Sequence, residues 1–108
     1  MADTIFIDDG YTQTRTIAAV PGLHPQLTII YRPVLSKDRW AFRHKVASVD
    51  SAVADNAEKE LIGKQCVSLN GEVLDKKKIA ILKPTVQQHI VDSILGYAPG
   101  DEAADLGN

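Results

Sequence analysis

Three histidines are the side chains of this sequence that most often act as general bases or metal ligands. They are His24, His44 and His89. The surrounding patterns place them on a loop and on two different helices. No His-x-x-x-His or Glu-x-x-His spacing brings two ligands to one helix face. The spacing therefore predicts no shared metal site.

Two other groups could carry chemistry, and both favour a structural interpretation. Cys66 would need a neighbouring base and a lowered pKa to act as a nucleophile, and a strand position supplies neither, so we interpret it as a small buried hydrophobe. Asp8-Asp9-Gly10 opens like a calcium loop, but no glutamate stands at the closing position, which favours a solvated turn. We expect no enzyme, no catalytic residue and no cofactor.

One basic run, Lys76-Lys77-Lys78, could contact phosphates together with Lys83. Aromatic residues for stacking bases are missing nearby, so a solvated helix start is the favoured interpretation. Three cations in a first helical turn oppose the helix dipole. An acidic partner surface would relieve that repulsion.

Trp40 and His44 form a candidate partner-binding patch. They lie one turn apart on a predicted helix, on the side opposite Phe42. Tryptophan is a frequent anchor of protein interfaces. In the alternative interpretation Trp40 packs on Leu35, just before the predicted Ser36 cap, as a hydrophobic staple.

Three strands are expected to position these residues. Threonine and other β-branched residues favour strands over 12–20 and 26–32, and a third strand is predicted over 65–69. Five residues, Pro21 to Pro25, join the first two, so an antiparallel pair is expected. A further short strand over 4–7 precedes the Asp-Asp-Gly turn.

Helices are expected between and after these strands. An apolar stripe predicts one helix of about seven turns that begins at Ser36 and ends at Gly63, with 48–51 as the place for a bend or break. The stripe consists of Phe42, Val46, Val49, Val53, Ala57 and Leu61. Asn70-Gly71 predicts a tight turn.

The last two helices follow that turn. Asp75 can cap a brief helix that carries Ile79 and Leu82, and Pro84 suits the first turn of a helix that Gly96 ends. The apolar side of this last helix is predicted to contain Val86, Ile90, Val91, Ile94 and Leu95.

The order of these elements predicts an α+β fold, a small antiparallel β-sheet packed against one long helix and a C-terminal helix pair. We expect a single domain over residues 1–97 and a flexible acidic tail over 98–108. The length of 108 residues, with 44% hydrophobic and 24% charged residues, fits one globular domain.

Composition also limits the partners. The net charge of −2 creates no field that would gather polyanions, so nucleic acid is an unfavoured partner. The N-terminus lacks a secretory signal and apolar runs are short, as in Ile17 to Val20, so no membrane association is expected. A single cysteine fits a reducing compartment.

Two motifs resemble small tail proteins of tailed bacteriophages and prophages. Tyr31-Arg32-Pro33, followed by Arg39-Trp40-Ala41-Phe42 on a helix, is similar to a pattern in these proteins, as is the helix from Leu82-Lys83-Pro84 to Gly96-Tyr97. The likeness covers about residues 26–97. Many such proteins carry a tryptophan in the strand after the long helix, where this sequence has Cys66-Val67-Ser68.

The resemblance implies a tail assembly chaperone or a tail structural protein. Its partners would be other tail proteins such as the tape-measure protein, or further copies of the same chain, in the host cytoplasm or in the virion tail. The expected partner-binding residues are Tyr31, Arg32, Pro33, Trp40 and His44. A regulatory or nucleic-acid-associated protein that uses Lys76 to Lys78, and an enzyme with a site built around His44, are the alternatives.

Overall fold

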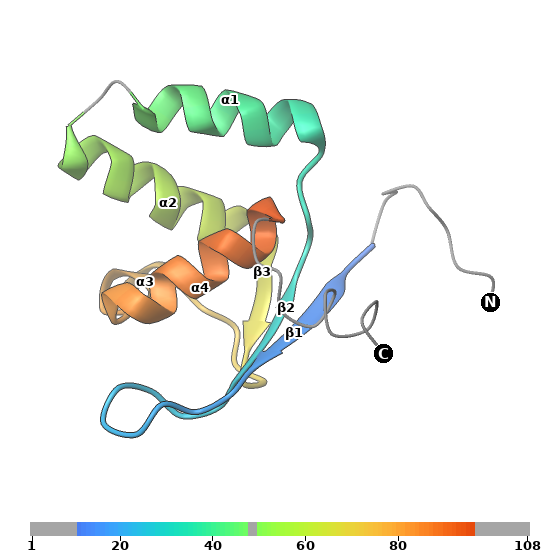
Figure 1. Cartoon of the computed structure of the whole chain (residues 1–108), viewed down its shortest axis with the longest axis vertical. Helices are drawn as coiled ribbons and strands as arrows, with labels where there is room; N and C mark the ends of the chain where they lie inside the picture. Colours follow the sequence, from blue (N-terminus) through green and yellow to red (C-terminus); the bar gives the residue numbers. More distant parts are fainter. Residues whose placement is uncertain (1–10, 48–49, 97–108) are drawn as a thin grey trace.

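A three-stranded antiparallel sheet lies at the base of the structure, a computed structural model that describes residues 11–47 and 50–96. The strands β1 (Gln13–Ile17), β2 (Leu27–Tyr31) and β3 (Cys66–Leu69) lie in the order β1-β2-β3 (Figure 1). Gln13 lies opposite Tyr31, and β2 also pairs antiparallel with β3. The predicted antiparallel pairing of the first two strands is confirmed.

The predicted single long helix is wrong, because two helices occupy its place. These are α1 (Ser36–Ala47) and α2 (Ser51–Gln65). Asp50 starts α2 as its N-cap, and its carboxylate accepts a hydrogen bond of 3.0 Å from the amide of Val53. Serine and aspartate compete with the helical backbone for hydrogen bonds. In the structure α1 ends at Ala47 and α2 begins at Ser51, which agrees with the bend or break that the sequence predicted for 48–51.

The predicted N-cap of α1 is also wrong by one residue. Ser36 is the first residue of the helix, and the amides of Asp38 and Arg39 both donate to the carbonyl of Leu35. Leu35 thus stands in the position that the sequence assigned to Ser36.

The predicted helix end at Gly63 is wrong, because α2 continues to Gln65, and Leu82 lies beyond the brief helix that Asp75 caps. The predicted caps of the last two helices and the tight turn are confirmed. Asp75 caps α3 (Lys76–Ala80), Pro84 opens α4 (Pro84–Leu95), and Gly96 ends it with a φ of 78°. Asn70 and Gly71 also adopt positive φ angles, 52° and 80°, which their residue types tolerate best.

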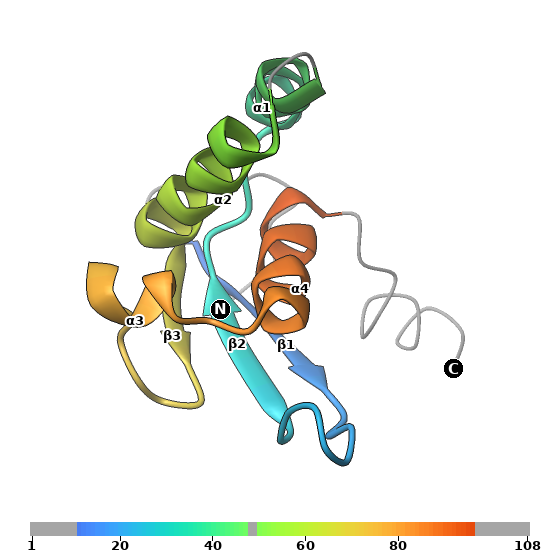
Figure 2. The same ribbon diagram turned by 90° about the vertical axis from the view of Figure 1, so that its left-hand side faces the viewer.

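The core forms where α2, α3 and α4 cover one face of the sheet (Figure 2). Alternate residues of β2 point into it, so Tyr31 is buried whereas Arg32, the next residue, is exposed. All five apolar residues predicted for α4 are buried. The buried core comprises Leu27, Ile29, Tyr31, Ile62, Ile79, Val86, Ile90, Val91, Ile94 and Leu95.

The fold class is therefore α+β, as expected, with two helices in place of the long one. The strand predicted over 4–7, the turn at Asp8-Asp9-Gly10 and the tail over 98–108 lie outside the described residues. Among residues 11–47 and 50–96, no helix has the length and apolar character needed to cross a bilayer.

Two isoleucines test the position of the core. Ile90 is fully buried, whereas Ile81 is 81% exposed. Ile90→Ala is expected to lower the free energy of unfolding by about 2–5 kcal/mol because it leaves a cavity. Ile81→Ala should change it by less than about 0.5 kcal/mol. Urea unfolding of both variants measures this, and equal losses would contradict the described packing.

Candidate partner-binding site on the first helix

The helix α1 is the outermost described helix of the fold and lies on α2, away from the sheet (Figures 1 and 2). Its start is tied to the end of α4, because Nη1 of Arg39 donates to the carbonyl of Leu95 at 3.2 Å and the amide of Val34 donates to Ile94 at 3.3 Å. Phe42 packs partly against the core. No residue within Ser36–Ala47 is buried, so α1 presents most of its surface outward.

Four residues on this outward side form what we call the α1 patch: Trp40, Arg43, His44 and Ala47. They line a shallow, open hollow. The Trp40 side chain is 63% exposed, and its ring centroid lies 4.3 Å from that of His44. Leu35 is itself 45% exposed. This exposure favours the partner-binding interpretation over the staple between Leu35 and Trp40.

The charge of α1 differs from that of the whole chain. The helix carries four cationic residues and one acid, which gives it a net charge of +3 with histidine neutral, whereas the whole chain carries −2. The cations are Lys37, Arg39, Arg43 and Lys45, and the acid is Asp38. Positive charge around an exposed tryptophan favours an acidic partner surface.

Tyr31, Arg32 and Pro33 lie outside the α1 patch. The Tyr31 hydroxyl donates to Gln13 at 3.2 Å. The backbone amide of Arg32 donates to the carbonyl of Gln65 at 2.7 Å, and the Gln65 side-chain amide donates to the carbonyl of Arg32 at 2.8 Å. These contacts fix the strand-to-helix connection to β1 and to the end of α2. Of the expected partner-binding residues, the structure therefore brings only Trp40 and His44 together at the hollow.

The lysine run has local structural contacts. The Lys78 amide donates to the capping carboxylate of Asp75 at 2.8 Å, and its ammonium pairs with Glu72. The hydrogen bond to Glu72 raises the pKa of Lys78. Lys76 and Lys77 are exposed. One of the three cations proposed for nucleic acid is thus already paired.

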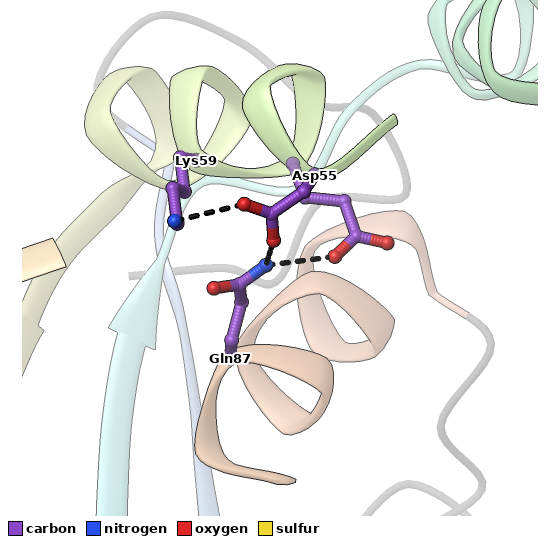
Figure 3. A network of polar contacts seen from close by, with 4 residues as sticks. Asp55, Lys59 and Gln87 are labelled. Carbon is purple, nitrogen blue, oxygen red and sulfur yellow. Dashed lines mark hydrogen bonds and ion pairs between the residues drawn. The ribbon is translucent and has the colours of Figure 1, made fainter. Parts of the chain in front are cut away.

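The acids near α4 are also engaged in structural contacts (Figure 3). The buried amide of Gln87 donates to Asp55 at 2.8 Å and to Glu58 at 2.9 Å, which joins α4 to α2. Lys59 pairs with Asp55 at 2.8 Å. The hydrogen bonds from Lys59 and Gln87 lower the pKa of Asp55. A carboxylate held in its charged form by two donors is a poor general acid.

The structure brings two of the three histidines together. The rings of His24 and His89 meet edge to face with centroids 5.5 Å apart, while His44 lies on α1. Across the described ranges, no group of three or more metal-ligating side chains converges. Sequence reasoning missed the His24 and His89 pair. The indication in the sequence was Arg15, a charged residue that strand alternation places on the same inward-facing side of β1 as Ile17.

Comparisons with protein-family models, with curated proteins and with solved structures find no match for this chain.

The thiol of Cys66 provides a test of the non-catalytic interpretation. Burial raises its pKa to about 11. At pH 8 only about 0.1% of such a thiol is thiolate, and the thiolate is the reactive species. Labelling with a disulfide reagent at pH 8 should therefore be about 100-fold slower in the folded protein than in urea, and should accelerate as the pH rises. Equal rates would contradict the described environment of Cys66.

Proposed function

We propose that this protein works without catalysis, by binding another protein through the α1 patch. The observation that carries the proposal is Trp40, which is 63% exposed on a helix that buries none of its own residues. Leaving so large an aromatic side chain in water forgoes the stabilisation that its burial would provide. A partner that covers Trp40 recovers that free energy.

The chemistry of the patch defines the kind of partner. Tryptophan and arginine are the residues that most often dominate binding energy, and here Trp40 and Arg43 line the same hollow. The partner surface would place an apolar side chain over Trp40 and Ala47. Carboxylates around it would meet the cations of α1 and speed association.

The more specific form of the proposal is a tail assembly chaperone or tail structural protein of a bacteriophage or prophage. It rests on the resemblance around Tyr31-Arg32-Pro33 and Arg39-Trp40-Ala41-Phe42. The partners would then be other tail proteins, such as the tape-measure protein, met in the host cytoplasm. The contacts of Arg32 with Gln65 support an architectural part for the first motif, since they set the direction in which the chain enters α1.

A pull-down with matched variants tests the proposal. Tagged protein is produced in cells that express the phage or prophage genes, and the proteins that co-purify are identified and titrated. Trp40→Ala is expected to weaken the captured complex about 10-fold or more, since truncation of an interface tryptophan costs about 2 kcal/mol or more. His44→Ala should weaken it less, because the ring supports Trp40 from one side.

Ile81→Ala is the control, since it removes an exposed apolar side chain from a different surface. If Trp40→Ala and Ile81→Ala bind alike, the α1 patch is not the interface. If other proteins co-purify and Trp40→Ala prevents their capture, the α1 patch is the interface but the phage assignment is rejected. If nucleic acid co-purifies and the double variant Lys76→Ala/Lys77→Ala abolishes its recovery, both the α1 patch and the phage assignment are rejected, and the basic run is the binding site.

A further inference from the structure

Four polar residues form a cluster between β1, the loop 18–26 and α4. Nη1 of Arg15 donates to the hydroxyl of Ser93 at 3.1 Å, and that hydroxyl donates to the carbonyl of His89 at 2.7 Å. The His24 ring, from the loop, meets the His89 ring edge to face. The cluster thus holds the hairpin loop and the edge strand onto α4.

Two polar atoms of this cluster, Nε of Arg15 and Nε2 of His24, are buried and have no hydrogen-bond partner among the described residues. His24 is only 5% exposed, and its Nδ1 lies 2.7 Å from the carbonyl oxygen of Pro25. A carbonyl only accepts, so this contact assigns the hydrogen of the neutral ring to Nδ1. A second proton would have to enter at the buried Nε2.

The charges around the two rings are mostly positive. Arg15 faces them from β1. At the start of α4, the ammonium group of Lys83 donates a hydrogen bond to the carbonyl of Leu23, the residue next to His24. Asp92 is the acid that acts on His89, and its carboxylate already accepts a hydrogen bond of 2.8 Å from Gln88. A proton on His89 would therefore add a half-buried positive charge near Arg15.

We propose that Arg15, His24 and His89 form a pH-sensitive latch, which holds β1 and the loop 18–26 on α4 while the His89 imidazole is neutral and releases them when it is protonated. Edge strand β1 is the part that would be released. It pairs only with β2 within the described sheet and contributes only the partly buried Ile17 to the core, so its opening exposes little apolar surface.

The direction of the pH effect follows from His89. Burial, followed by the charges of Arg15 and His24, lowers the pKa of His89, with Asp92 opposing. The unfolded or opened state then binds the proton more tightly than the closed state. The stabilisation is complete above the ordinary histidine pKa of about 6.5 and is lost as the pH falls below it.

Amide hydrogen exchange read by NMR tests the latch. Between pH 7.5 and 5.0, after correction for intrinsic exchange, protection of the β1–β2 amides should fall about 10-fold more than that of the α2 amides. His89→Gln removes the titrating group and should abolish this difference. His44→Gln is the matched control, since it removes an exposed imidazole from α1, and should leave the difference unchanged.

The wild-type protein alone also tests the proposal, whether or not the variants fold. The ring signals of His89 should titrate with a midpoint below the ordinary histidine pKa of about 6.5. A His89 midpoint at or above that ordinary value would overturn the latch. So would equal loss of protection in the hairpin and in α2.

Discussion

The contact between the apolar side of α4 and the inward face of β2 is the interaction on which the rest of the structure depends. Ile90 and Ile94 are fully buried, and so are Ile29 of β2 and Ile62 of α2. Removing such side chains from water is the main favourable contribution to folding. The polar links lie around this contact, since Gln87 joins α4 to α2 and Ser93 joins it to β1.

This arrangement leaves α1 with a different environment from the other long helices. The helices α2 and α4 both bury residues, whereas α1 is held at its first turn by Arg39 and packs inward mainly through Phe42. A helix that contributes so little to the core is free to vary its outward residues for binding. Trp40 and the surrounding cations therefore lie where a partner can reach them without disturbing the fold.

Two polar regions of the protein differ in how their charges are balanced. Around Gln87, two carboxylates share one amide, and one of them, Asp55, also pairs with Lys59, so both carboxylates have a hydrogen-bond donor. Around His24, two imidazoles lie close to Arg15, and a proton on His89 adds positive charge to a cluster that is already cationic. The first region joins two helices at neutral and mildly acidic pH. The second joins a hairpin to a helix in a way that depends on protons.

The sequence by itself determined the elements whose signals are local. Asn70-Gly71, Asp75, Pro84 and Gly96 each act through their own backbone or nearest neighbours, and the inward side of α4 follows from its helical spacing. Tertiary structure decided what depends on distant residues. It fixed the exposure of Trp40 and the meeting of His24 with His89. These features depend on which surfaces the core covers, and no spacing along the chain records that.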